Sequence, residues 1–277
     1  MSAPGDAARL RAMTRGAAIA ASMATATGPP PVRGPGLRAE VTAPGAFAWD
    51  DDGIITYAGP AEDLPSAPTI GREDRGCLVP GFVDCHVHLP FAGWRADEFE
   101  ARLRGVSYAE LHGEDGGIFR SSRQLAAADD DEVLEFCRPL VAEMLANGTT
   151  ALELKTGYGL SVEAELRQAR LARRLADEVA AQSCTVTLLA CHAVPPGMQR
   201  ADWVALACEE LIPAAAAEGL ADAVDIYVES IAFSLEDLEA VAKAAREAGL
   251  PLRVHADQLG ATGAASAAVS ACSGSNP

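Results

Sequence analysis

The sequence is short of basic residues. Only 22 Lys and Arg stand against 39 Asp and Glu, which gives a formal net charge of −17. Such an excess of negative charge repels polyanions, so it argues against nucleic acid or an anionic membrane surface as a partner. An anionic small molecule could bind only where the chain supplies a local cation.

The sequence also lacks paired cysteines and long apolar runs. Its 7 cysteines are scattered and odd in number, and no C-x-x-C occurs, which is typical of reduced thiols in a cytoplasmic protein. No apolar run reaches the ~18 residues that a membrane-spanning helix needs. The segment from Arg15 to Ala26 imitates a secretion signal, but it is rich in Ala rather than Leu. We therefore expect a cytoplasmic protein.

The N-terminal part carries weak structural signals. Residues 1–45 are rich in Ala, Gly and Pro without a helical or strand period, so we expect them to be loosely ordered. Two short apolar runs, 46–49 and 54–58, flank Asp-Asp-Asp-Gly and predict a β-hairpin. We assign residues 1–76 to a partly disordered N-terminal segment with a small, sandwich-like β element, and residues 77–277 to a second domain.

Beyond residue 77, predicted strands alternate with predicted helices. The strands are 77–84, 149–155, 185–192, 223–229 and 252–255; the helices are 129–147, 161–182, 200–218 with an interruption at Pro213, and 234–248. Apolar strands alternating with helices predict a parallel sheet, either doubly wound or a (β/α)8 barrel. A barrel closes with eight strands, whereas about five are present here.

The predicted fold class is therefore α/β, an incomplete (β/α)8 barrel of the TIM type preceded by a small N-terminal β element. The tail from Ala264 to Pro277 carries no signal for a strand or for a helix end. It suggests a chain that stops before the barrel is complete.

His86 and His88 are the strongest chemical signal. They stand two residues apart at the carboxyl end of an apolar strand, and the period of two places both imidazoles on one face, within reach of one ion. Imidazole suits Zn, Fe or Ni, and a catalytic site keeps one position open for water. An incidental histidine pair is the alternative.

The three other histidines differ in how strongly the sequence indicates a functional role for them. His255 ends a later strand, and with the H-x-H pair upstream it becomes the natural third ligand. His192 closes the predicted strand 185–192 and could be a ligand, a substrate contact or a packed core residue. His112 lies in a polar stretch, and we assign it no function.

Two residues in loops are candidates for substrate binding. The guanidinium of Arg95 can fork onto a carboxylate, although a surface ion pair with Asp97 or Glu98 is the simpler interpretation. Tyr158 lies between two glycines directly after a strand, where its hydroxyl could approach a ligand or merely pack on the surface.

Several motifs together resemble one family. They are Val-Pro-Gly-Phe-Val-Asp at 79–84 followed by H-x-H, and the stretches 95–99, 116–118, 155–160, 192–195 and 255–259. From about residue 53 to residue 260 the chain resembles the imidazolonepropionases of the amidohydrolase superfamily. Lys-Thr-Gly-Tyr-Gly-Leu and His-Ala-Val-Pro distinguish this family from dihydroorotases, hydantoinases and nucleobase deaminases.

The resemblance implies a (β/α)8 barrel with a small β-sandwich built from both chain ends, usually in a homodimer. It also implies hydrolysis of the ring amide C–N bond of 4-imidazolone-5-propanoate to N-formimidoyl-L-glutamate, in histidine degradation. By the same resemblance His86, His88 and His255 would hold one Zn or Fe ion.

The resemblance further assigns the substrate contacts. Arg95 would bind the propanoate carboxylate and supply the cation that this acidic chain needs for an anionic substrate. Tyr158 and His192 would hold the ring and its amide, and Gln258 would face the substrate.

The sequence departs from the family pattern in two ways. Some relatives carry a glutamate where this chain has Gln258, whose amide cannot take up a proton at neutral pH. The family's aspartate on the last barrel strand, the expected acid/base and fourth metal ligand, has no counterpart in these 277 residues, nor has the histidine of the sixth strand. The catalytic acid/base residue is therefore unknown.

Two other functional interpretations stay open. One is a truncated barrel fragment without catalytic activity, and the other is a related cyclic amidohydrolase or deaminase. Nor does the sequence settle whether Lys155 does more than pack, although the one-metal pattern argues against its modification into a bridging ligand.

Overall fold

A computed structural model describes residues 16–27, 38–65, 69–107, 111, 116–179 and 182–273. The chain divides into two units, Met1–Phe82 and Val83–Pro277. The boundary falls after residue 82 rather than after residue 76, because strand β5 (Thr69–Leu78) pairs with the N-terminal sheet. His112 lies outside the described residues.

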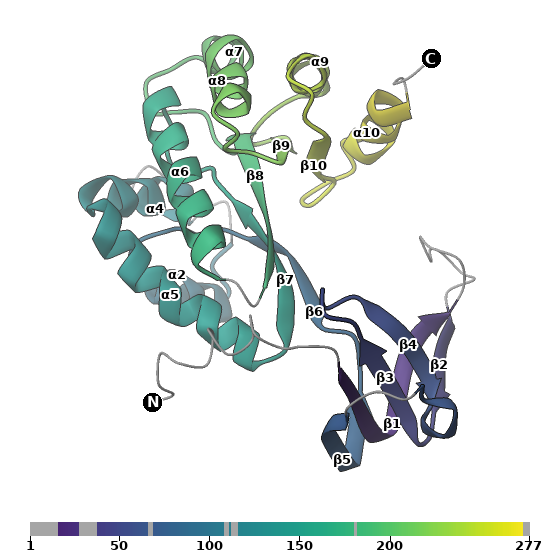
Figure 1. Cartoon of the computed structure of the whole chain (residues 1–277). Helices are drawn as coiled ribbons and strands as arrows, with labels where there is room; N and C mark the ends of the chain where they lie inside the picture. Colours follow the sequence, from purple (N-terminus) through teal and green to yellow (C-terminus); the bar gives the residue numbers. More distant parts are fainter. Residues whose placement is uncertain are drawn as a thin grey trace. The chain divides into compact units, whose positions relative to one another are not determined.

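The N-terminal unit holds a five-stranded sheet, seen in Figure 1. Its path is β2 (Arg38–Thr42), β1 (Gly16–Thr27), β3 (Gly45–Trp49) and β4 (Ile55–Pro60), and β5 adds to β1 in parallel. The short helix η2 (Ala61–Asp63) follows β4. The predicted hairpin is confirmed as β3 and β4, and the carboxylate of Asp50 accepts hydrogen bonds from two backbone N–H groups of the turn.

The expectation of loose order over residues 1–45 is wrong for β1 and β2. Strand β1 is rich in alanine, a weak strand former, so its sequence carries no strand signal. Its neighbours supply the stability instead. Ala17, Ala20 and Met23 are buried together with Ala46 and Ala48 of β3. Residues 1–15 and 28–37 lie outside the described part of the chain.

The second unit is built on one curved sheet whose strands follow chain order. It runs from β6 (Phe82–Val87) through β7 (Thr149–Lys155), β8 (Ser183–Cys191) and β9 (Ala223–Val228) to β10 (Leu252–Ala256). The pairs β7–β8, β8–β9 and β9–β10 are parallel. This confirms the incomplete (β/α)8 barrel (Figure 1).

One predicted strand is wrong. Residues 77–84 belong to two strands, because β5 ends at Leu78 and β6 begins only at Phe82. Pro80 interrupts the run, since proline has no N–H to donate to a sheet. As a result His86 lies within β6, and His88 follows its last residue.

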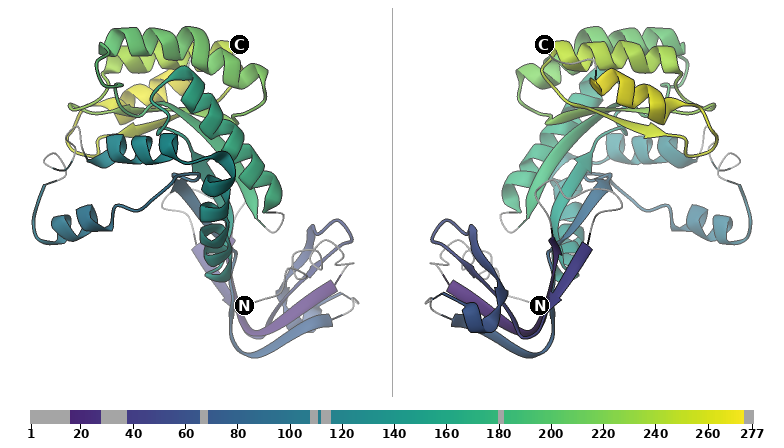
Figure 2. Two further views of the ribbon diagram at one scale, coloured as in Figure 1. Left: turned by 90° about the vertical axis from the view of Figure 1, so that its left-hand side faces the viewer. Right: turned by 90° about the vertical axis from the view of Figure 1, so that its right-hand side faces the viewer.

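Helices connect the strands of the second unit, and most of them pack along its sheet, whereas the helix that follows β6 stands apart (Figure 2). They are α2 (Ala96–Leu103), α4 (Gly117–Ala127), α5 (Asp130–Ala146), α6 (Val162–Glu178), α7 (Arg200–Leu206), the π-turn η3 (Ala207–Leu211), α8 (Ile212–Ala217), α9 (Leu235–Glu247) and α10 (Ala264–Ser273). Ser161 and Ser234 cap α6 and α9, because each side chain accepts a backbone N–H group, as does that of Asp129 before α5.

Two helical predictions need correction. The helix predicted over 200–218 with an interruption at Pro213 keeps a helical backbone throughout, and its irregularity is the π-helical segment η3, which lies just before Pro213. The tail does not lack structure throughout: residues 264–273 form α10, which packs on β10. Its alanines favour a helix even without a stop signal.

The strands of the curved sheet separate apolar from charged side chains by alternation. Leu152 and Leu154 of β7, and Val224 and Ile226 of β9, belong to the apolar clusters shared with the helices. The residues between them, such as Asp225, belong to the opposite face. This second face carries the charged groups of the site.

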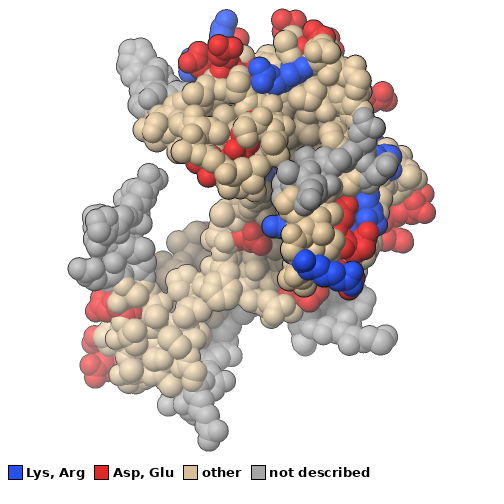
Figure 3. All heavy atoms as spheres, turned by 180° about the vertical axis from the view of Figure 1, so that it is seen from behind, with Lys and Arg blue, Asp and Glu red and all other residues tan. Residues whose placement is uncertain are grey.

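Basic and acidic groups lie beside one another on the surface (Figure 3). Pairs such as Arg138–Glu178 and Arg170–Glu218 link neighbouring helices. Among the described residues, no helix combines the length and the apolar character needed to cross a bilayer.

Candidate active site

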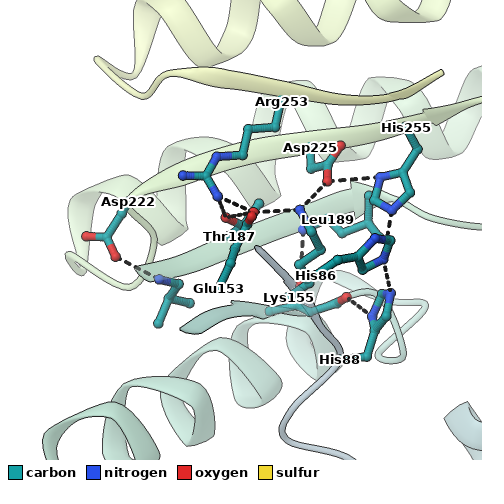
Figure 4. A network of polar contacts seen from close by, with 12 residues as sticks. His86, His88, Glu153, Lys155, Thr187, Leu189, Asp222, Asp225, Arg253 and His255 are labelled. Atoms are coloured by element: carbon teal, nitrogen blue, oxygen red, sulfur yellow. Dashed lines mark hydrogen bonds and ion pairs between the residues drawn. The ribbon is translucent and has the colours of Figure 1, made fainter. Parts of the chain in front are cut away.

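Three histidines converge at one edge of the curved sheet (Figure 4). The Nε2 atom of His86 lies 3.2 Å from Nε2 of His88 and 3.0 Å from Nε2 of His255. One nitrogen from each ring lies within 4.8 Å of the other two. Three imidazole nitrogens directed at one point form a donor set that fits a transition-metal ion.

The outer nitrogens of two rings are held by acceptors. His88 Nδ1 lies 3.2 Å from the carbonyl oxygen of Thr156, and His255 Nδ1 lies 3.0 Å from Oδ2 of Asp225. An acceptor at Nδ1 places the proton there and leaves the lone pair of Nε2 for a metal.

The surroundings keep two of these rings neutral. Burial, strengthened by the nearby imidazoles of His192 and His86, holds the pKa of His88 well below its usual value. Burial and the neighbouring His255 also lower the pKa of His86. A neutral imidazole is the form that binds a metal, so no proton need be displaced near neutral pH.

All seven site residues predicted from the sequence line one pocket of about 170 Å³. They are His86, His88, Arg95, Tyr158, His192, His255 and Gln258. Ile118 and Tyr227 complete the lining and were missed. Tyr227 stands two residues after Asp225 on the same face of β9, so the period of two could have indicated it.

Arg95 lines the pocket and also forms the ion pair with Glu98 that was the simpler interpretation. It is the N-cap residue of α2, and its Nη1 donates to Oε2 of Glu98 at 3.1 Å. The same carboxylate accepts the backbone N–H of Gly117, at the start of α4. Glu98 therefore fixes the guanidinium at the pocket wall.

The loop after β7 is shaped by its glycines. Gly157 has a φ of +113°, and a Cβ there would lie 2.6 Å from Nδ1 of His192. That nitrogen instead lies 2.9 Å from the carbonyl oxygen of Gly157. Only glycine combines this backbone conformation with so close an approach.

A buried carboxylate anchors the same loop from below. Glu165 of α6 accepts the N–H groups of Gly157 at 2.9 Å, Gly159 at 2.7 Å and Leu160 at 3.0 Å. Burial raises the pKa of Glu165, although these donors act in the opposite direction. Tyr158, held by its own N–H to Gln168, is thereby presented to the pocket.

A group of buried charges that the sequence analysis missed lies behind the histidines (Figure 4). Glu153, Lys155 and Asp225 are only 6%, 4% and 1% exposed. Lys155 Nζ lies 2.6 Å from Oε1 of Glu153 and 2.7 Å from Oδ2 of Asp225. Glu153 is also paired with Arg253 and accepts the hydroxyl of Thr187 at 2.7 Å.

These contacts keep the carboxylates ionised. Burial alone would raise the pKa of Asp225, but the hydrogen bond with His255 and the charge of Lys155 outweigh it and lower that pKa. The pKa of Glu153 is also lowered, because its hydrogen bond with Lys155 and its other contacts outweigh burial. Charged residues at alternate positions of otherwise apolar strands were the available signal.

The sequence profile of the amidohydrolase family matches residues 77–275. The chain belongs to the amidohydrolase family. Members of this family are generally metal-dependent. The three histidines of this amidohydrolase form a donor set that fits a metal ion.

Comparison with curated proteins confirms the finer resemblance. This amidohydrolase is 47% identical to an imidazolonepropionase of Xanthomonas campestris over 210 residues, which cover 75% of this chain and 52% of the relative. It is also 47% identical to an imidazolonepropionase of Ectopseudomonas mendocina over 214 residues, 76% of this chain and 53% of the relative. The chain thus spans about half the length of these relatives.

The fold is also found in solved structures. A 5-methylcytosine deaminase from Klebsiella pneumoniae matches with a TM-score of 0.55 at 17% identity, covering 87% of this chain and 51% of that one. At this identity the likeness supports the amidohydrolase fold and not a shared substrate.

Proposed function

We propose that this chain supplies the metal-binding and substrate-binding residues of an imidazolonepropionase. The reaction is hydrolysis of the ring amide C–N bond of 4-imidazolone-5-propanoate, which yields N-formimidoyl-L-glutamate. The observation that carries the proposal is the single pocket in which the three histidines meet Arg95, in a chain 47% identical to imidazolonepropionases.

His86, His88 and His255 would hold one Zn or Fe ion. When bound, such an ion lowers the pKa of water and polarises a carbonyl oxygen, which is the chemistry needed to hydrolyse an amide. The preset Nδ1 contacts of His88 and His255 support this assignment, because both rings already direct Nε2 to the common point.

The remaining pocket residues would bind and orient the substrate. Arg95 would bind the propanoate carboxylate through its guanidinium nitrogens not taken by Glu98. Tyr158 and His192, which lie close to His88, would contact the ring and its amide. Gln258 can donate and accept hydrogen bonds there but cannot take up a proton at neutral pH.

We further propose a cytoplasmic homodimer that acts on a small anionic substrate, without nucleic acid or membrane as a partner. The cysteines of the described residues are free thiols, which suits a reducing compartment. The dimer rests on the resemblance to imidazolonepropionases alone. Arg95 at the pocket provides the cation required by an anionic ligand of a chain with a net charge of −17.

The test is an assay of the metal-loaded chain with 4-imidazolone-5-propanoate, dihydroorotate and guanine. We expect calorimetry to show binding of the propanoate but not of guanine. These 277 residues alone, in which the family's acid/base aspartate has no counterpart, should form no N-formimidoyl-L-glutamate. In Arg95→Ala, the dissociation constant of the propanoate should rise about 10- to 100-fold, as expected for loss of hydrogen bonds to a charged group. If the chain gives no turnover, calorimetric binding of the propanoate distinguishes an inactive fragment, which still binds it, from a wrong substrate.

A further inference from the structure

The buried charges behind the histidines are arranged as a chain that ends on the metal site. Glu153 and Lys155 lie on β7, Asp225 on the inward face of β9 and His255 on β10. The contacts run from Glu153 to Lys155 (2.6 Å), from Lys155 to Asp225 (2.7 Å) and from Asp225 to His255 (3.0 Å). Figure 4 shows the four side chains in this order.

Asp225 is fixed at both carboxylate oxygens. Its Oδ2 accepts from Lys155 Nζ and from Nδ1 of His255, and its Oδ1 accepts the backbone N–H of Ile226 at 2.8 Å. A carboxylate held by three donors cannot rotate, so the imidazole that donates to it is fixed in direction and tautomer.

Lys155 is the part of this arrangement that makes it stable. Asp225 is 1% exposed, and an unpaired carboxylate at such a depth is strongly disfavoured. Its only Lys or Arg partner among the described residues is Lys155, because Arg253 pairs with Glu153 instead. An ammonium held between two carboxylates is also a poor candidate for modification into a metal ligand.

We propose that Lys155 and Asp225 are positioning residues, which hold His255 with its proton on Nδ1 and its Nε2 directed at the metal. The inference deepens the proposed metal site and rests on it. Replacement of either residue should weaken metal binding about 10- to 100-fold, the usual effect of removing an outer partner of a ligating histidine.

The first test is the tautomer of His255 in the full, metal-free chain, read from long-range ¹H–¹⁵N correlations of its imidazole. We expect the Nδ1–H form in the unsubstituted chain and loss of that preference in Asp225→Asn. A His255 protonated on Nε2 in the unsubstituted chain would overturn the proposal. The measurement needs neither metal nor substrate.

The second test is the Co²⁺ affinity of Lys155→Met and Asp225→Asn, measured by competition with a chelator. Lys243→Met, at an exposed helical lysine, and Asp177→Asn, at an exposed aspartate, are the matched controls and should bind Co²⁺ as the unsubstituted chain does. Affinity that stays within twofold in a folded Lys155→Met would overturn the role of Lys155. If Lys155→Met does not fold, Asp225→Asn and the tautomer decide.

The two proposals fail differently. If the unsubstituted chain binds no Co²⁺, the proposed metal site is wrong. The tautomer of His255 in the metal-free chain still tests whether its ring is positioned by Asp225. If the chain binds Co²⁺ but neither binds nor hydrolyses 4-imidazolone-5-propanoate, the proposed function is wrong, and the positioning role is still decided by its own measurements.

Discussion

The imidazole of His88 lies flat against that of His192, with ring centroids 4.8 Å apart and planes within 8° of parallel. Two consecutive carbonyl groups hold the pair, since Nδ1 of His88 contacts Thr156 and Nδ1 of His192 contacts Gly157. The loop after β7 therefore fixes one ring of the proposed metal site and one ring of the proposed substrate pocket together.

We expect the two stacked histidines to differ in function, with His88 as a metal ligand and His192 as a support for its ring. His88→Ala should lower Co²⁺ affinity by more than the ~100-fold that outer partners reach, because it removes a ligand. His192→Ala should lower it less than about tenfold, because His192 only supports the ring of His88. Chelator competition measures both, and His192→Phe, which keeps a flat ring, is the control. Equal losses in both alanine variants would make His192 a ligand.

Glu165 should be a strong determinant of stability. In Glu165→Gln one oxygen becomes an NH₂ group, which cannot accept from the backbone N–H groups that the carboxylate now satisfies. The free energy of unfolding should fall by about 1–3 kcal/mol, the cost of leaving a buried donor unpaired. Denaturant unfolding measures it.

The matched control is Glu163→Gln, on the exposed side of the same helix α6, which should change stability by less than about 0.5 kcal/mol. Equal stability of the Glu165 and Glu163 variants would show that the loop needs no anchor.

Asp222 should make stability depend on pH. Burial acts to raise its pKa, but Arg173 and the N–H of Val186 outweigh burial and hold it below the ordinary 3.8. A depressed pKa gives stability that is fully present above about pH 4 and is lost as the pH falls through the folded-state value.

Asp222→Asn should therefore be less stable at pH 7 by about 1 kcal/mol, a low figure because the carboxylate is 43% exposed. The deficit should shrink toward zero at acidic pH, measured by denaturant unfolding across the pH range. A deficit in Asp222→Asn that is constant with pH would contradict the role of the ionised carboxylate.

Local signals predicted the curved sheet well. Strands β7 and β9 lie in predicted strands, and helices α6 and α9 lie within predicted helices. These features depend on neighbours in the sequence, so the pattern alone indicates them. The site residues followed, because the carboxyl ends of the strands bring His88 and His255 to one edge.

Pairing between distant segments was not predictable in the same way. β1 pairs with β5, about fifty residues later in the chain, and its own alanine-rich sequence does not predict a strand. The contact of Lys155 with Asp225 likewise depends on the register of β7, β8 and β9, which the sequence does not state. The contact of Lys155 with the proposed metal site becomes visible only in the folded chain.

Anomalous diffraction from crystals of the full chain grown with Zn²⁺ tests the central claim most directly. The account predicts one strong peak about 2.0–2.1 Å from Nε2 of each of His86, His88 and His255, the usual Zn–N distance. A zinc ion bound elsewhere, or one in contact with fewer than two of these nitrogens, would contradict it.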